Sequence, residues 1–214
     1  MRFLITAGPT REALDPVRYI SNRSSGKMGY AIADAAIEAG HNVVLISGPV
    51  NFNPPDAAKL VSISTSDEMF EAVNQHIGDC DILVMSAAVA DYKPATVSKE
   101  KIKKSDASRS LPLAPTRDIL ASLPRERKFL VVGFAAETQN IEANALKKLH
   151  DKNCDLLVAN DARIAMESDE NEVLVLFRNG KKQKISRAPK KIVARELIKI
   201  FENVCEKGLT KKIT

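Results

Sequence analysis

The stretch Asn22-Arg23-Ser24-Ser25-Gly26-Lys27-Met28-Gly29 decides how the N-terminal part of this chain folds. It joins a polar loop, which follows an expected strand at Arg2–Thr6, to an expected amphipathic helix. Gly26 and Gly29 allow a phosphate or acyl group to approach the backbone closely. The N-terminus of the helix behind them supplies unpaired N–H groups and a partial positive charge. The stretch therefore predicts a phosphate-handling loop in an α/β fold.

Two common phosphate-binding motifs do not fit this stretch. A P-loop needs glycine where Ser21 stands and serine or threonine where Met28 stands. The dinucleotide fingerprint G-x-G-x-x-G fails because Ser24 replaces its first glycine. The loop therefore belongs to another class of phosphate site, in which Asn22 either contacts the substrate or simply caps a turn.

Short apolar runs alternate with longer helical patterns, which favours a Rossmann-like, mostly parallel sheet flanked by helices, in one domain over residues 1–214. The expected strands are Arg2–Thr6, Asn42–Ser47, Asp81–Ser86, Phe129–Phe134 and Asp155–Ala159. Apolar residues at helical spacing predict three helices. These are one that ends at Gly40, one that starts after an N-cap at Ser66, and one over Asn140–Lys152.

The C-terminal part predicts a β-hairpin extension of this fold. Val173–Phe177 and Lys184–Ser186 flank Asn179-Gly180, which favours a type I′ turn. Pro189 is expected as the first residue of a closing helix. No element is expected over Ala88–Ala114, and a loop of that length in a compact domain is usually functional or mobile.

Composition favours a cytoplasmic protein that binds small anions. Hydrophobic residues make up 44% and charged residues 28%, and the longest apolar runs, such as Ile82–Ala90, are too short to cross a membrane. The formal charge is +5, but no tryptophan and only 5% aromatic residues are present, so nucleic-acid binding is not expected. Cys80, Cys154 and Cys205 are widely spaced, which indicates reduced thiols.

Polar or small residues follow four of the expected strands. They are Gly8, Thr10, Arg11, Arg18 and Asn22; then 87–92 and 99–104; then 134–138; and finally 160–161. Because the carboxyl ends of parallel strands meet at one edge, we expect a ligand site there. These segments also have plainer interpretations. The lysines within 101–104 could form a solvated face, and Asp91 could cap a turn.

No nucleophile can be assigned from the residues. His41, His76 and His150 do not follow strands, so surface roles are expected for all three. No Ser-His-Asp or Cys-His arrangement is evident. The chemistry should therefore depend on positioning and charge stabilisation, as in nucleotidyl transfer.

Several motifs, in order along the chain, resemble bacterial phosphopantothenate–cysteine ligase. The similarity covers roughly residues 3–200. The motifs are Thr6-Ala7-Gly8-Pro9-Thr10-Arg11-Glu12, Asp15-Pro16-Val17-Arg18-Tyr19-Ile20-Ser21-Asn22, Ser24-Ser25-Gly26-Lys27-Met28-Gly29, Ala87-Ala88-Val89-Ala90-Asp91-Tyr92, Glu100-Lys101-Ile102-Lys103-Lys104 and Gly133-Phe134-Ala135-Ala136-Glu137-Thr138.

The resemblance implies a reaction of coenzyme A biosynthesis in two steps. The carboxylate of 4′-phosphopantothenate attacks CTP to give an acyl-cytidylate, and L-cysteine then displaces CMP. It also implies Mg²⁺, a homodimer and association with a phosphopantothenoylcysteine decarboxylase, to which bacterial relatives are commonly fused. Met1 leads directly into the first strand, so the chain is expected to be a free-standing ligase or an excised half, without flavin.

The resemblance also implies roles for individual residues. It makes Asn22, Arg18 and Lys101 catalytic and assigns no metal ligands. Substrate contacts are implied for Gly8, Ser25, Gly26 and Asn22. Nucleotide contacts are implied for Met85, Ser86, Ala87, Asp91, Lys101, Thr116, Arg117, Asp118, Ile119, Phe134, Lys148 and Lys152.

The sequence departs from the family pattern at two places. Arg23 stands where many relatives carry histidine, and Thr116-Arg117-Asp118-Ile119 lacks the stiffening proline of the related Asn-Pro-Asp-Ile segment. The lysine-rich segment Lys93–Leu113 is expected to be mobile when empty and to close over nucleotide.

Two rival functions remain open: an NAD(P)-linked reductase, disfavoured by the absence of a Tyr-x-x-x-Lys pair, and a non-catalytic nucleotide-binding regulator.

Overall fold

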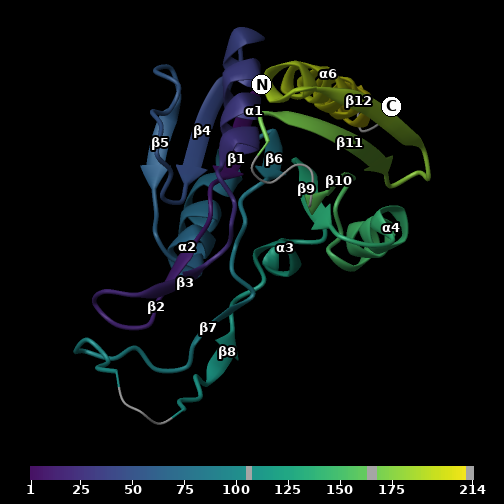
Figure 1. Cartoon of the computed structure of the whole chain (residues 1–214). Helices are drawn as coiled ribbons and strands as arrows, with labels where there is room; N and C mark the ends of the chain where they lie inside the picture. Colours follow the sequence, from purple (N-terminus) through teal and green to yellow (C-terminus); the bar gives the residue numbers. More distant parts are fainter. Residues whose placement is uncertain (105–107, 163–167, 211–214) are drawn as a thin grey trace.

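The computed structural model describes residues 1–104, 108–162 and 168–210, with side chains described up to residue 207. Its centre is an eight-stranded sheet in the order β12-β11-β10-β9-β6-β1-β4-β5 (Figure 1). Six strands pair in parallel, and they are β1 (Arg2–Ala7), β4 (Asn42–Ser47), β5 (Lys59–Ser62), β6 (Ile82–Met85), β9 (Leu130–Glu137) and β10 (Leu156–Asp161). The C-terminal hairpin, β11 (Glu170–Phe177) and β12 (Lys182–Pro189), extends the sheet in antiparallel fashion.

The central strands are apolar on both faces because helices cover both sides of the sheet. On one face, Phe3 and Ile5 belong to a core cluster that includes α1 (Lys27–Glu38) and α6 (Lys190–Thr210). On the other face, Leu4 belongs to a cluster that includes α2 (Ser66–His76) and α4 (Ile141–Asp151). The mostly parallel, Rossmann-like fold is therefore confirmed. No helix in the described part of the chain is long and apolar enough to cross a membrane.

The direction in which strands are added changes at β1. The chain first builds β4 and β5 on one side of β1 and then places β6, β9 and β10 on the other. Ligands of such sheets bind beyond the carboxyl ends of the strands at this switch point. The segments that follow Ala7 and Met85 are therefore placed where a site is expected.

A pair of short antiparallel ribbons projects from this edge of the sheet (Figure 1). One pairs β2 (Arg11–Ala13) with β3 (Tyr19–Ser21), and the other pairs β7 (Tyr92–Pro94) with β8 (Leu113–Pro115). We call the described residues of 11–21 and 92–115 the flap. Its two parts are joined where the Ser98 N–H donates to the Leu14 carbonyl at 3.0 Å.

Several local expectations need correction. The N-cap of α2 is Thr65 rather than Ser66, because Thr65 and Glu68 form a reciprocal capping box that contributes about 1 kcal/mol. The expectation of no element over 88–114 is wrong at β7 and at the start of β8. The expected mobility of Lys93–Leu113 stays a prediction, and residues 105–107 lie outside the described residues.

The hairpin turn is not of type I′. Gly180 has φ +84°, but Asn179 is not among the described residues with positive φ, and type I′ requires both. The Gly180 N–H donates to the Phe177 carbonyl at 2.9 Å and the Phe177 N–H to the Lys181 carbonyl at 3.0 Å, which gives a longer loop with glycine in the left-handed region. Pro189 is the last residue of β12, so α6 begins one residue later than expected.

Candidate functional site

A cavity of about 450 Å³ lies at the carboxyl edge of the sheet, where the switch point predicts it. It is bordered by the loop before α1 and the start of α1, by the loop after β6, and by the carboxyl-terminal halves of β9 and β10. Most of the expected site residues border it together: Asn22, Ser25, Gly26, Met85, Ser86, Ala87, Asp91, Thr116, Arg117, Asp118, Ile119, Phe134, Lys148 and Lys152.

The N-terminus of α1 forms one wall of the cavity. Gly26 is its N-cap at φ +78°, without a side-chain cap, and no acidic residue lies in the first turn. A Cβ at Gly29 would lie 2.6 Å from both the Ala7 Cβ and the Ser86 Oγ, so only glycine lets the helix approach β1 this closely. The positive end of the helix dipole therefore borders the cavity, a setting that favours anions.

Asn22 is held at the cavity by the loop after β6. Its Nδ2 donates to the Ala88 carbonyl at 3.0 Å. Ala88 is itself fixed to the loop after β1, since its N–H donates to the Gly8 carbonyl at 2.9 Å. The side chain of Asn22 thus bridges the loops on either side of the switch point.

The segment 116–119 and α4 form the opposite wall. The Lys148 Nζ donates to the Phe134 carbonyl at 2.9 Å, and Lys152 forms an ion pair with Asp118. Asp118 also accepts from the Ala121 N–H at 3.0 Å as the N-cap of α3 (Ile119–Ser122). Burial acts to raise the pKa of Asp118, but the hydrogen bonds from Lys152 and the Ala121 backbone outweigh it and hold that pKa below the usual value.

Two cavity residues, Lys190 and Asn171, were missed by the sequence reasoning. Lys190 is 7% exposed and its Nζ donates to the Ser168 carbonyl at 2.6 Å. Burial, and the nearby positive charge of Lys27, lower its pKa. A cation at the first position of a helix opposes the helix dipole, and this unusual placement is the signal that could have identified Lys190.

Asn171 is a buried polar residue near the start of β11. It is 2% exposed, and its Oδ1 accepts from the Asn160 Nδ2 at 3.3 Å. Lys27, which also borders the cavity, forms an ion pair with Asp169 at 2.6 Å. Lys27, Asn160, Asn171 and Lys190 therefore give this side of the cavity both positive charge and amide groups.

Three expected site residues, Arg18, Lys101 and Gly8, do not border the cavity. In the flap, the Arg18 Nε donates to the Asp15 Oδ2 at 3.0 Å and its Nη2 to the Ile102 carbonyl at 2.5 Å. Lys101 is exposed next to Ile102. Gly8 has φ +74° and packs on Gly48, whose carbonyl oxygen would lie 3.0 Å from an added Cβ.

His41 and the cysteines support the core rather than the cavity, whereas His150 is exposed as expected. The surface role expected for His41 is wrong, because its side chain is 11% exposed, stacks on Phe3 and lies 2.7 Å from Glu202. Burial raises the pKa of Cys80 to about 12 and that of Cys154 to about 11. These cysteines are therefore protonated thiols at neutral pH, as expected for reduced, structural residues.

Among the residues that the structure describes, no group of three or more His, Cys, Asp or Glu could hold a metal ion. Mg²⁺ in nucleotide enzymes usually binds through phosphates and water, with few protein ligands. The described residues of the cavity therefore offer no metal site built from the protein alone.

Comparison with known proteins places these features in a family. Residues 1–204 match the family described as DNA/pantothenate metabolism flavoprotein C-terminal domain. The coenzyme A biosynthesis bifunctional protein CoaBC of Vibrio vulnificus (strain CMCP6) is 43% identical over 208 residues, which are 94% of this chain and 52% of that protein. The CoaBC protein of Bacillus subtilis (strain 168) is 46% identical over 200 residues, or 91% and 49%. The chain thus spans about half the length of these relatives.

Solved structures agree with this placement. The C-terminal domain of a CoaBC protein is 43% identical, covers 96% of both chains and has a TM-score of 0.83. A mutant of Cab2 in complex with phosphopantothenate-cysteine is 16% identical, with a TM-score of 0.85 over 100% of this chain and 89% of that one. At that identity the second comparison supports the fold alone.

Proposed function

Because the chain belongs to the family of DNA/pantothenate metabolism flavoprotein C-terminal domains, we propose that it is a phosphopantothenate–cysteine ligase of coenzyme A biosynthesis. The observation that carries this proposal is the single cavity that joins Asn22 and the α1 N-terminus to the segment 116–119 and α4. The similarity to the C-terminal domain of a CoaBC protein supports it.

The proposed reaction activates a carboxylate and then forms an amide. A carboxylate oxygen of 4′-phosphopantothenate attacks the α-phosphorus of CTP, and the bond from that phosphorus to the bridging oxygen breaks, so that pyrophosphate leaves. The amine of L-cysteine then attacks the acyl carbon and loses a proton, while CMP leaves with the carboxylate oxygen. Activation is needed because a free carboxylate is a poor electrophile.

The two walls of the cavity suit different parts of these substrates. We assign the nucleoside to the wall of Thr116–Ile119, Phe134, Lys148 and Lys152, where the sequence resemblance places nucleotide contacts. The phosphates are assigned to the start of α1 with Lys27 and Lys190, since helix dipole and ammonium groups both stabilise anions. When bound, Mg²⁺ would reduce the charge of those phosphates.

Asn22 lies between these walls and suits the acyl group. An amide can donate to an acyl or phosphoryl oxygen and accept from an amine, whereas a carboxylate can only accept. The hydrogen bond to Ala88 orients Asn22 before substrate arrives. Such preorganised contacts to the reacting group stabilise charge that develops in the transition state.

We further propose that the chain forms a homodimer through the flap. Six large apolar side chains of the flap are exposed: Val17 at 59%, Tyr19 at 49%, Tyr92 at 56%, Val97 at 54%, Leu111 at 43% and Leu113 at 47%. Exposed apolar groups that lie close together are typical of interfaces. Light scattering should give twice the chain mass, and replacing Val17 and Tyr92 with serine should give the mass of one chain.

The test of the proposed activity is a coupled assay of pyrophosphate release. The protein is incubated with CTP, Mg²⁺ and phosphopantothenate, with and without L-cysteine. We expect pyrophosphate only when phosphopantothenate is present, and phosphopantothenoylcysteine only when cysteine is added. Absence of pyrophosphate with CTP and with every other nucleoside triphosphate would contradict a ligase and favour a nucleotide-binding regulator.

The nucleotide preference is a separate proposal. Backbone groups near Phe134 and Ala87 border the cavity and can supply donors and acceptors to a cytosine ring. We propose CTP over ATP. Comparable kcat/KM for the two nucleotides in direct competition would overturn this preference while leaving the ligase activity intact.

A further inference from the structure

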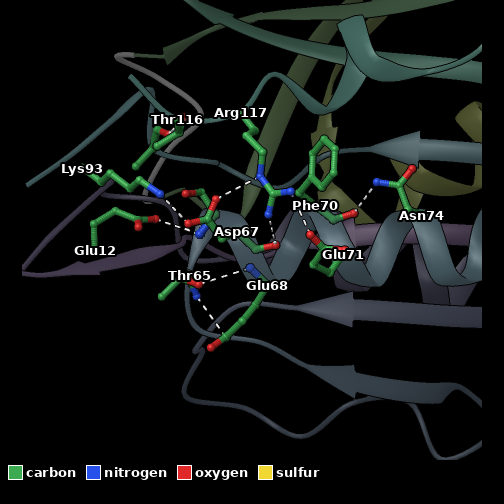
Figure 2. Close-up of polar contacts among 12 residues, drawn as sticks. Glu12, Thr65, Asp67, Glu68, Phe70, Glu71, Asn74, Lys93, Thr116 and Arg117 are labelled. Atoms are coloured by element: carbon green, nitrogen blue, oxygen red, sulfur yellow. Dashed lines mark hydrogen bonds and ion pairs between the residues drawn. The ribbon is translucent and has the colours of Figure 1, made fainter. Parts of the chain in front are cut away.

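A cluster of charged side chains behind the cavity fastens the segment 116–119 to α2 (Figure 2). The Arg117 Nε donates to the Asp67 Oδ1 at 3.1 Å, and its Nη1 donates to the Glu71 Oε1 at 2.8 Å. The Arg117 Cζ lies 3.9 Å from the centre of the Phe70 ring, in cation–π contact. The guanidinium of this cavity residue is therefore directed at α2.

The residues on either side of Arg117 are fixed to other elements. The Thr116 N–H donates to the Asp91 carbonyl at 2.9 Å and its Oγ1 to the Ala90 carbonyl at 2.6 Å. Asp118 pairs with Lys152, the C-cap of α4. Thr116, Arg117 and Asp118 are thus tied to three different parts of the fold.

The same turn of α2 also holds the flap. Asp67 forms a second ion pair, with Lys93 of β7. In addition, the buried Glu12 of β2 accepts a hydrogen bond from the Ser66 N–H at 2.8 Å. The pKa of Asp67 is held below its usual value, mainly by the hydrogen bond from Lys93 and also by the one from Arg117, although burial opposes this shift. The start of α2 is therefore a common anchor for the flap and the segment 116–119.

We propose that Arg117 is a positioning residue for the nucleotide, which acts by clamping Thr116–Ile119 to α2 from behind the cavity wall. The inference rests on the proposed function and adds to it a residue that organises the nucleotide site without contacting the reacting atoms. In this chain the clamp restrains a segment that lacks a proline. Arg117 and Asp67 are about half exposed, at 45% and 41%, and such ion pairs contribute little to global stability. The clamp should therefore affect nucleotide binding more than folding.

The first test replaces Arg117 with glutamine, which removes the charge and the forked geometry. We expect the KM for CTP to rise roughly tenfold while kcat stays within about twofold, the pattern of lost ground-state positioning. The KM for phosphopantothenate should not change. The matched control is Arg195→Gln, because Arg195 makes a similar forked contact to Glu38, at 2.7 and 3.1 Å, and is 49% exposed between α6 and α1. That variant should keep both KM values.

A charge exchange separates clamping from direct contact with the nucleotide. The triple variant Asp67→Asn, Glu71→Arg and Arg117→Glu restores an ion pair across the same gap and leaves no carboxylate beside the introduced glutamate, so it should recover a KM for CTP within about threefold of the wild-type value. If Arg117 instead contacted the nucleotide phosphates, the introduced glutamate would make the triple variant worse than Arg117→Gln. That result would overturn the proposal, as would an unchanged KM in Arg117→Gln or a loss confined to kcat.

The outcome is distinguishable from failure of the proposed activity. CTP affinity can be measured by calorimetry in the wild type and in all three variants, independently of turnover. If wild-type protein binds CTP but makes no product, the proposed function fails and the clamp is still tested by these affinities. If Arg117→Gln does not fold, a triple variant that folds and binds CTP like the wild type supports the clamp, and one that folds but binds weakly contradicts it.

Discussion

The cavity wall and the flap both carry residues expected in the reaction, but different forces hold them. In the wall, residues follow parallel strands whose register pairs Thr6 with Met85, and both strands are buried. In the flap, Arg18 and Lys101 depend on Asp15, an ion-paired carboxylate that also accepts from the Ile102 N–H at 3.1 Å. The wall is therefore preformed by the core, whereas the flap depends on a few polar contacts made by Asp15 and Glu12.

The largest expected effect comes from the wall, at Asn22. Asn22→Asp adds a negative charge beside the proposed acyl-cytidylate, which is itself an anion, so the two repel each other. We expect formation of phosphopantothenoylcysteine to fall on the order of a hundredfold, while the acyl-cytidylate accumulates. Mass spectrometry of a quenched reaction measures both species. Normal turnover without trapped intermediate would leave Asn22 as a turn residue.

A smaller effect is expected in the flap, at Lys101. The residue is exposed in the structure and reaches nucleotide only if the flap closes. Lys101→Gln should therefore slow acyl-cytidylate formation roughly tenfold, measured as the single-turnover rate of pyrophosphate release. Lys103→Gln is the matched control, since it removes an exposed lysine two residues away and should leave the rate unchanged. Equal rates in the two variants would exclude closure by Lys101.

The next prediction concerns Lys190 of the cavity wall, where we expect an effect on nucleotide binding alone. Lys190→Met keeps much of the buried volume but removes the ammonium group beside Lys27. The KM for CTP should rise about fivefold with little change in kcat, because the charge stabilises bound phosphates before and during reaction. The control is Lys184→Met, which removes an exposed lysine of β12 that pairs with Glu172 of β11. A purely structural Lys190 would lower the melting temperature without changing this KM.

The same comparison explains what the sequence could predict. The wall residues follow strands that consist of continuous apolar runs, such as Ile82–Met85. The positions of these strands, and of a site beyond their ends, could therefore be predicted. The flap strands are three residues long, which is too short for a periodic pattern, and β7 and β8 are far apart in the sequence. The direction of the Arg117 side chain could not be predicted either, because it is set by Asp67 and Glu71, about fifty residues earlier.

The smallest expected effect concerns pH and the flap. The Arg18 guanidinium, with backbone N–H groups, holds the pKa of Asp15 well below its usual range, although burial opposes this. A lowered pKa in the folded state means that the stabilisation is complete above the unfolded pKa, about 4, and is lost as the pH falls through the folded value. The protection factor of the Ile102 amide, which is its hydrogen-exchange rate corrected for the intrinsic pH dependence, should therefore fall below about pH 4 in the wild type. In Asp15→Asn this protection should be low at every pH, and a wild-type profile in that variant would contradict this role.

The transfer of oxygen from substrate to nucleotide tests the central claim most directly. Phosphopantothenate labelled with oxygen-18 in its carboxylate is incubated with CTP, Mg²⁺ and L-cysteine, and CMP is analysed by mass spectrometry. If the carboxylate attacks the α-phosphorus in this cavity, each CMP carries one oxygen-18 atom, and Asn22→Asp makes labelled CMP much more slowly. Product formed together with unlabelled CMP would contradict an acyl-cytidylate, and with it the function assigned to the cavity wall.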